Sequence, residues 1–266
     1  MPDQDGRTQQ TPNDSLRSTG QQLSPFELAQ QRLIVALDVP TADAALALAG
    51  RLRDQCQWFK VGLELYIAAG PAIVEKLAAR GYSIFLDLKL HDIPNTVASA
   101  VRSTASLGAS MLTIHASGGP AMLAAAQDAL SGMAKPPQLL AVTVLTSMDQ
   151  SQLTAIGLSK TPQEQVATLA NLGLQAGIHG FVCSPQEVAM LRELTGPQGV
   201  LVTPGIRPSG AEKGDQQRIA TPTYALEQGA SYLVVGRPIT QAPDPALAAE
   251  AILLEIAEAL AIAPTE

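Results

Sequence analysis

The chain has 266 residues, 46% of them hydrophobic and only 3% aromatic, which suits one α/β domain with a core of Ala, Leu, Val and Ile. Its formal net charge of -7 argues against a nucleic-acid-binding surface, so a few local cations must hold any anionic substrate. Its two cysteines, Cys56 and Cys183, lie far apart without metal-ligand spacing, which argues against a disulfide framework or a Cys-rich zinc site.

The first residues differ in composition from the rest of the chain. Residues 1–24 are rich in Gln, Ser, Thr, Asp and Pro and contain no apolar run of signal-peptide or membrane length. We therefore expect a disordered extension at 1–24, a folded domain at 25–266, and a cytoplasmic protein with no membrane partner. From Arg32 onward, short β-branched apolar runs alternate with longer Ala/Leu-rich stretches. That alternation is typical of parallel β/α units.

Eight apolar runs are predicted as strands. They are Leu33–Asp38, Phe59–Gly62, Tyr82–Leu88, Met111–Ala116, Leu139–Leu145, Gly180–Ser184, Val200–Ile206 and Tyr232–Gly236. The stretches between and after them predict helices, several of which open with Pro in the first turn. These helices are Thr41–Arg53, Gly70–Arg80, Thr96–Leu107, Pro120–Ser131, Pro162–Ala176, Pro185–Glu193, Pro222–Gln228 and Pro245–Leu260.

Eight β/α units of this size predict a single (β/α)8 TIM barrel, in which active sites lie at the C-terminal ends of the strands. The competing fold is a doubly wound open sheet. No Gly-x-Gly-x-x-Gly turn follows the first predicted strand, which weakens the dinucleotide-binding version of that fold.

The third predicted strand ends in alternating acids and a lysine, in the stretch SIFLDLKLHDIPNT at 83–96. Strand alternation places Asp87 and Lys89 on the same face, and Asp92 follows in the loop just beyond. Charges at such a position are costly to desolvate unless they are paired. The pattern therefore indicates either an active site or a structural ion-pair cluster.

Polar residues also stand at the ends of other predicted strands, where a barrel would bring them together. A charged residue there can also mark only the point at which a buried strand reaches solvent. The residues concerned are Asp38, Lys60, His115, Thr146, Ser147, Arg207 and Arg237. A lone histidine at such a place, His115 or His91, is more often packed than a ligand, and no His/Asp/Glu set indicates a metal. No Ser-His-Asp arrangement indicates acyl transfer either.

The last two strand ends indicate a phosphorylated substrate. Gly236 exposes a backbone N–H at the end of the eighth predicted strand, and Arg237 can clamp a phosphate through two donors. A long polar loop follows the seventh strand, and loops of that length are usually functional lids or disordered inserts. Phosphate sites built from the loops after strands seven and eight recur in TIM barrels.

The spacing Asp87-x-Lys89-x-x-Asp92, followed by Ile93-Pro94-Asn95-Thr96, resembles the signature of the orotidine 5'-phosphate decarboxylase family in its bacterial form. Related barrel enzymes such as hexulose-phosphate synthase share the Asp-x-Lys-x-x-Asp core, so later segments must separate decarboxylase from aldolase. The later segments that fit the decarboxylases are Thr146-Ser147, Pro204-Gly205-Ile206-Arg207-Pro208, Gln216 and Gly236-Arg237. The resemblance extends from Arg32 to about Arg237.

This resemblance implies decarboxylation of orotidine 5'-phosphate to uridine 5'-phosphate (UMP) and CO2, the last step of pyrimidine nucleotide synthesis. It implies no cofactor, no metal, and a homodimer in which Asp92 completes the site of the other subunit. Asp38 would bind the ribose hydroxyls, Thr146 and Ser147 the pyrimidine. The implied catalytic residues are Lys89, Asp87, Asp92 and Lys60. The implied substrate-binding residues are Asp38, Lys60, Asp87, Thr96, Thr146, Ser147, Arg207, Gln216, Gly236 and Arg237.

Loss of CO2 from C6 leaves negative charge in the ring plane without an electron sink, so electrostatics must carry the catalysis. We expect the Lys89 ammonium to stabilise that charge and then to donate a proton to C6. Asp87 would act by repelling the substrate carboxylate or, as we favour, by positioning Lys89. One alternative is a sugar-phosphate aldolase or epimerase, which should need a divalent metal or an enediolate-handling base. The other is an inactive phosphonucleotide-binding protein, which would not need Lys89.

Overall fold

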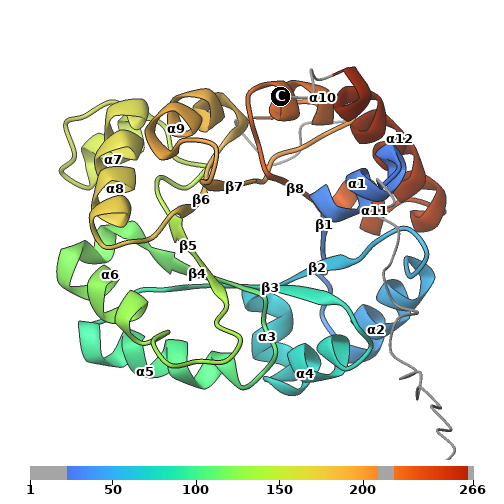
Figure 1. The fold of residues 1–266 in the computed structure, drawn as a ribbon, viewed down its shortest axis with the longest axis horizontal. Coiled ribbons are helices and arrows are strands. Elements are labelled where there is room, and N and C mark those ends of the chain that lie inside the picture. Colours follow the sequence, from blue (N-terminus) through green and yellow to red (C-terminus); the bar gives the residue numbers. More distant parts are fainter. Residues whose placement is uncertain (1–22, 209–218, 263–266) are drawn as a thin grey trace, which may run out of the picture.

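The computed structural model describes residues 23–208 and 219–262. Its parallel strands form a closed barrel in which each strand pairs with its neighbours in sequence and β1 pairs with β8. The helices lie around the outside of this ring (Figure 1). The strands are β1 Leu33–Ala36, β2 Trp58–Gly62, β3 Ser83–Leu90, β4 Met111–His115, β5 Gln138–Val142, β6 Gly180–Val182, β7 Val200–Thr203 and β8 Tyr232–Val235. The TIM-barrel prediction is confirmed, because an open doubly wound sheet would leave two unpaired edges.

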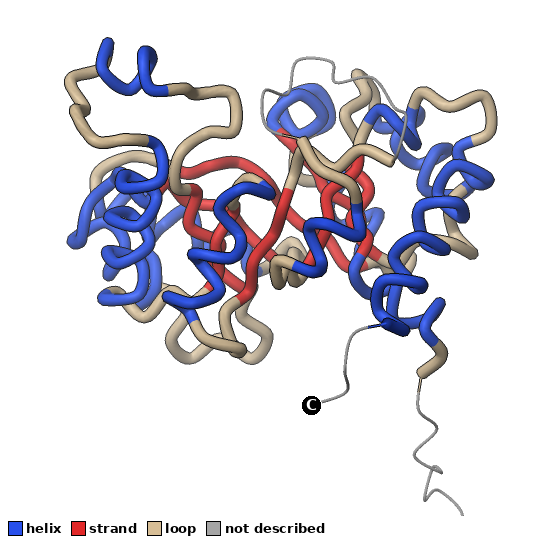
Figure 2. Tube along the Cα trace, turned by 90° about the horizontal axis from the view of Figure 1, so that it is seen from above, coloured by secondary structure: helices blue, strands red, loops and turns tan. Residues whose placement is uncertain are grey.

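The helices cover the outer face of the strands, as the view turned by 90° also shows (Figure 2). They are α1 Pro25–Arg32, α2 Ala42–Arg51, α3 Leu63–Ala69, α4 Ala72–Ala78, α5 Pro94–Ala105, α6 Gly119–Asp128, α7 Gln150–Ala155, α8 Pro162–Gln175, α9 Val188–Thr195, α10 Pro222–Glu227, α11 Arg237–Thr240 and α12 Pro245–Ile262. Two 3-10 turns, Ala116–Gly118 and Pro185–Glu187, precede α6 and α9. Every predicted helix overlaps an observed one, whereas α1, α3, α7 and α11 were not predicted.

Helix α1 begins directly after the segment predicted to be disordered. Ser24 caps it: the hydroxyl of Ser24 accepts a hydrogen bond from the N–H of Glu27, and the Glu27 carboxylate accepts one from the N–H of Ser24 at 2.7 Å. This reciprocal pair satisfies two backbone donors at the start of the helix. The helix packs against α12. The rest of the predicted extension, residues 1–22, lies outside the described residues, and so does Gln216.

The interior of the barrel is filled by side chains and is not a pore. Alternation along β1 turns Ile34 and Ala36 inward, while Leu33 and Val35 face the helices. The inward cluster is Ile34, Ala36, Phe85, Met111, Leu140, Val202 and Val234. Trp58 and Tyr232, which pack against this cluster, meet edge to face with ring centroids 5.2 Å apart.

The turns at the N-terminal ends of the last strands are tied together by Arg192. Its guanidinium donates to the carbonyls of Gly196 and Gly199 before β7, and to the carbonyl of Gly229 and the hydroxyl of Ser231 before β8, at 2.7–3.0 Å. Charged donors on carbonyl groups make strong hydrogen bonds. This end of the barrel therefore serves stability. Among the described residues, no helix is long and apolar enough to cross a membrane.

Candidate active site

A cavity of about 460 Å³ opens at the C-terminal ends of the strands. Eight of the site residues predicted from the sequence line it: Asp38, Lys60, Asp87, Lys89, Thr146, Arg207, Gly236 and Arg237. Its other walls are mainly apolar and come from the strand ends and the loops after them: Ala36, Phe85, Val142, Val144, Leu145, Val182, Pro204, Gly205 and Val234. A lining that combines charged groups with apolar side chains suits a flat ring that carries an anionic group.

Three other predicted site residues do not line this cavity. Asp92 and Thr96 are exposed around the start of α5, and Ser147 is exposed after Thr146. The side chain of Asp92 accepts a hydrogen bond from the N–H of Ile93 at 2.6 Å. Within the single chain, therefore, Asp92 stands apart from the charged residues that precede it in the motif.

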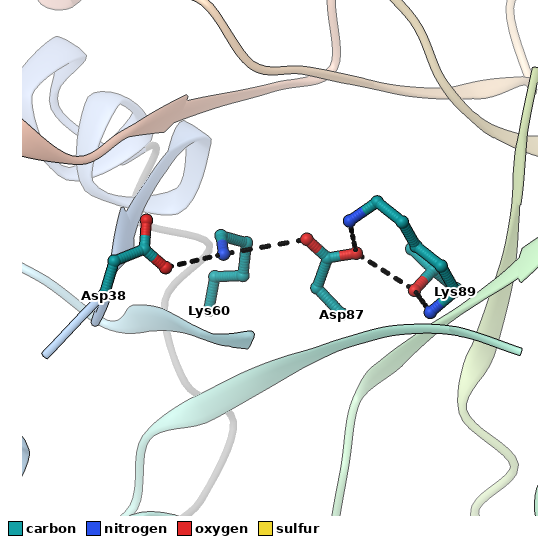
Figure 3. Close-up of polar contacts among 5 residues, drawn as sticks. Asp38, Lys60, Asp87 and Lys89 are labelled. Carbon is teal, nitrogen blue, oxygen red and sulfur yellow. Dashed lines mark hydrogen bonds and ion pairs between the residues drawn. The ribbon is translucent and has the colours of Figure 1, made fainter. Parts of the chain in front are cut away.

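Four side chains form a row of alternating charge across the floor of the cavity, drawn in Figure 3. Lys60 Nζ lies 3.0 Å from Asp38 Oδ1 and 3.6 Å from Asp87 Oδ2, and Lys89 Nζ lies 2.7 Å from Asp87 Oδ1. The Asp87 and Lys60 side chains are only 13% and 12% exposed, whereas that of Asp38 is 56% exposed at the outer end. Each buried charge thus has a neighbour of opposite sign, as the cost of desolvation requires.

The two lysines keep Asp87 ionised. Burial of the Asp87 carboxyl raises its pKa, but the charges of Lys60 and Lys89 and the hydrogen bonds from Lys89 and Thr113 lower it more. The net result is a pKa below the ordinary value. The site therefore holds a buried carboxylate between two lysine side chains.

Lys89 reaches Asp87 by a different backbone path from the one predicted. The backbone of Lys89 has φ 51°, in the left-handed region, and is the one residue other than glycine with positive φ among those described. The β3 register on β4 shifts here, because Leu86 pairs with Leu112 but Leu90 pairs with Ile114. The prediction of regular strand alternation was wrong for this segment, although the two side chains do meet. The bulge re-aims Lys89, as bulges beside active sites often do.

The cavity lining also carries two arginines, Arg207 and Arg237. Arg207 is only 8% exposed, and its Nη1 donates to the carbonyl of Ile206 at 2.8 Å. Burial lowers the pKa of Arg207, and the nearby charge of Arg237 lowers it further. Two guanidinium groups close enough to repel each other form a good site for a dianion, which would relieve both effects.

Gln241 also lines the cavity, and the sequence interpretation missed it. It follows Arg237 by four residues at the end of the short helix α11, so the signal was the helical spacing of two polar residues. The helix itself was not predicted, because it has only four residues.

His91 and His115 lie together outside the cavity lining, with ring centroids 5.4 Å apart. Burial lowers the pKa of His115, and the charges of His91 and Lys89 lower it further. Among the described residues, no group of three or more His, Cys, Asp or Glu side chains is arranged to hold a metal ion.

Comparison with known proteins finds one family that matches most of the chain. Residues 31–252 match the Orotidine 5'-phosphate decarboxylase / HUMPS family. The chain is 55% identical to the orotidine 5'-phosphate decarboxylase of Nitrosococcus oceani over 230 residues, which cover 86% of this chain and 99% of that protein. It is 51% identical to the enzyme of the same name from Moorella thermoacetica, over 86% of this chain and 93% of that protein.

Among solved structures, the crystal structure of orotidine 5'-phosphate decarboxylase from Lactobacillus acidophilus is similar. It has 42% sequence identity and a TM-score of 0.75, covering 85% of this chain and 99% of that one. The residues that match the family model, 31–252, include all eight strands of the barrel. The chain belongs to the Orotidine 5'-phosphate decarboxylase / HUMPS family.

Proposed function

We propose that this protein decarboxylates orotidine 5'-phosphate to UMP and CO2, the last step of pyrimidine nucleotide synthesis. The observation that carries the proposal is the row Asp38, Lys60, Asp87 and Lys89 in the lining of one cavity that also contains Arg207 and Arg237. Relatives at 50–55% identity are named for this reaction.

In the proposed complex, the substrate phosphate binds Arg207 and Arg237, whose mutual repulsion it relieves. Asp38, the most exposed member of the charged row, accepts hydrogen bonds from the ribose hydroxyls. Thr146 contacts the pyrimidine ring. This arrangement places C6 and its carboxylate over Asp87 and Lys89 at the inner end of the row.

The chemical step breaks the bond between C6 and the carboxylate. The electron pair stays on C6 and CO2 leaves. The Lys89 ammonium stabilises this charge and donates a proton to C6, and the neutral amine then takes a proton from solvent. Asp87 acts mainly by holding Lys89 in place, 2.7 Å away. Lys60 holds the other carboxylate oxygen of Asp87.

The test is to mix purified protein with orotidine 5'-phosphate and EDTA and to follow the ring absorbance, with UMP identified by chromatography. Turnover that EDTA does not change is the expected result. A protein that binds UMP tightly but produces none from orotidine 5'-phosphate would be the inactive binding protein. Metal-dependent activity on a pentulose or hexulose phosphate, without decarboxylation, would identify an aldolase or epimerase.

We further propose that two chains share their active sites. Asp92 is exposed and separate from the charged row, and Ile93 beside it is a large apolar side chain that is 67% exposed. In a twofold dimer this loop would lie over the neighbouring cavity, with Asp92 completing the neighbour's site and Ile93 in the interface.

Mixing subunits tests this arrangement. Lys89→Ala and Asp92→Ala chains, each inactive alone, should form mixed dimers with one intact site. Random exchange makes about half of the dimers mixed, so activity should recover to roughly a quarter of wild type. A mixture that stays inactive after mass spectrometry has verified subunit exchange would exclude shared sites.

The cytoplasmic location is a proposal as well. Cys56 and Cys183 are buried thiols, as expected in a reducing compartment. Cell fractionation with an activity assay tests this location.

A further inference from the structure

Thr113 lies beneath the charged row and is not part of the cavity lining. It belongs to β4 and is 0% exposed. Its hydroxyl oxygen accepts a hydrogen bond from the backbone N–H of Lys89 at 2.8 Å and donates one to Asp87 Oδ1 at 3.1 Å. One buried hydroxyl therefore joins the backbone of one residue of the reacting pair to the side chain of the other.

The backbone of Lys89 needs such a partner. With φ 51° it occupies a region that is costly for any residue with a Cβ atom. The register shift between Leu86 and Leu90 interrupts the regular β3–β4 pairing at this point. A side-chain acceptor on the neighbouring strand, 2.8 Å from the Lys89 N–H, takes the place of a carbonyl partner and holds the bulge in one conformation.

The direction of both hydrogen bonds follows from the chemistry of the groups. An ionised carboxylate only accepts hydrogen bonds, and a backbone N–H only donates them. The hydroxyl between them must therefore donate a hydrogen bond to Asp87 and accept one from the N–H of Lys89. A hydroxyl is the small group that can do both. Valine has nearly the same shape but would leave a buried N–H without this acceptor.

We propose that Thr113 is a positioning residue for the reaction proposed above, on which this inference rests: its hydroxyl fixes the Lys89 backbone and the Asp87 carboxylate so that ammonium and carboxylate stay in contact. Thr113 does not touch the substrate. It acts through Lys89 and Asp87, and its loss should therefore slow the chemical step more than it weakens ligand binding. The hydrogen bond from Thr113 is also one of the causes of the lowered pKa of Asp87.

Three variants separate positioning from packing. Thr113→Val removes the hydroxyl and keeps the shape, Thr113→Ser keeps the hydroxyl, and Thr203→Val is the control. Thr203 is also a strand threonine with 0% exposure, but the polar contact of its hydroxyl is with the sulfur of Cys183, 3.9 Å away and outside the charged row. Each variant is measured for kcat, for the UMP dissociation constant and for unfolding in urea.

Thr113→Val should lower kcat about 100-fold, the effect of a displacement near 1 Å in a catalytic group, while its UMP dissociation constant changes less than about threefold. Thr113→Ser should restore kcat to within about fivefold of wild type, and Thr203→Val should leave it unchanged. A Thr113→Val protein that keeps kcat within about threefold of wild type would overturn the proposal. So would equal losses of kcat in Thr113→Val and Thr113→Ser, because such a result points to packing.

A second measurement does not depend on catalysis. Carbon-13 NMR of the Asp87 carboxyl should give a higher pKa in Thr113→Val than in the wild-type protein, and a wild-type value in Thr113→Ser. Equal titration of Asp87 in all three proteins would overturn the inference even if kcat had fallen. A wild-type protein that does not decarboxylate orotidine 5'-phosphate would instead refute the proposed function, and the NMR titration would still decide whether Thr113 acts on Asp87.

Discussion

Replacing Gly62 with alanine should disturb the charged row without disturbing the fold. Gly62 is the last residue of β2, and a Cβ atom placed there would lie 2.9 Å from Lys60 Nζ and 3.4 Å from Asp38 Oδ1. Its backbone, with φ -95° and ψ -176°, is open to any residue. The substitution therefore adds one methyl group directly against the ammonium of Lys60.

The size of the effect follows from these distances. A methyl carbon needs about 3.5 Å, so Lys60 Nζ must move by roughly 0.5–1 Å. If the move lengthens the Lys60–Asp38 contact from 3.0 Å to about 4 Å, the Coulomb energy falls by about 1.4 kcal/mol at an effective dielectric constant of about 20, or tenfold in an equilibrium. A shift of that size next to Asp87 should lower kcat/KM by about 10- to 100-fold.

The assay compares kcat/KM for orotidine 5'-phosphate with the free energy of unfolding in urea. The free energy of unfolding of Gly62→Ala should fall by no more than about 1 kcal/mol. This loss is expected because Gly62 is the N-cap of α3 and alanine is a poorer N-cap than glycine. Gly50→Ala is the matched control, because Gly50 lies in α2 and a Cβ there meets nothing within 4 Å. A Gly62→Ala enzyme with the kcat/KM of wild type would refute the idea that the position of Lys60 matters for catalysis.

Three further predictions concern the same cavity. Lys89→Ala should abolish decarboxylation while UMP binding, measured by calorimetry, stays within about threefold; substantial remaining turnover would exclude Lys89 as the acid. Arg237→Ala should weaken UMP binding but not uridine binding, and equal losses for both would place the phosphate elsewhere. Because Asp87 has a lowered pKa, its ionised form stabilises the fold above the ordinary aspartate pKa of about 3.9, and this contribution is lost as the pH falls through the lowered value. The difference in unfolding free energy between wild type and Asp87→Asn should thus shrink as the pH falls below about 5 and through the lowered pKa of Asp87, and a constant difference would contradict this sign.

The barrel could be predicted from the sequence because the same pattern, a short apolar run followed by an Ala/Leu-rich stretch, is repeated along the chain. Each predicted strand overlaps an observed one, although several were extended too far at their C-terminal ends. Leu139–Leu145 was predicted where β5 is Gln138–Val142. The apolar run continues there because Val144 and Leu145 line the cavity instead of pairing in the sheet. Apolarity alone does not distinguish these two environments.

The helices that were missed lack different signals. α3 begins directly after β2 with Gly62 as its N-cap and no side-chain hydrogen bond, so nothing in the sequence marks a boundary. For α7 the signal was present, since Asp149 and Gln152 form a capping box. The sequence interpretation gave that segment no assignment.

The charged row could be predicted in composition but not in detail. Alternation suggested that Asp87 and Lys89 share a face, and they do meet, yet through a left-handed residue and a register shift that no pattern of apolar residues reveals. The contacts of the Thr113 hydroxyl could not be predicted for the same reason. It lies inside an apolar run, Met111–His115, and only the three-dimensional pairing of β3 with β4 shows that its hydroxyl faces the two charged residues.

The two ends of the barrel show how this chain separates stability from chemistry. At the N-terminal end, the guanidinium of Arg192 donates hydrogen bonds to the carbonyl groups of two turns, so this charged group contributes to the stability of the fold. At the C-terminal end the chain carries features that cost stability in the free protein: positive φ at Lys89 and repulsion between Arg207 and Arg237. A bound phosphate relieves the repulsion between the arginines, and the strained backbone of Lys89 sets the position from which its ammonium meets a developing anion. The unfavourable terms are thus grouped where a ligand or a transition state can offset them, which is the distribution expected of a preorganised catalyst.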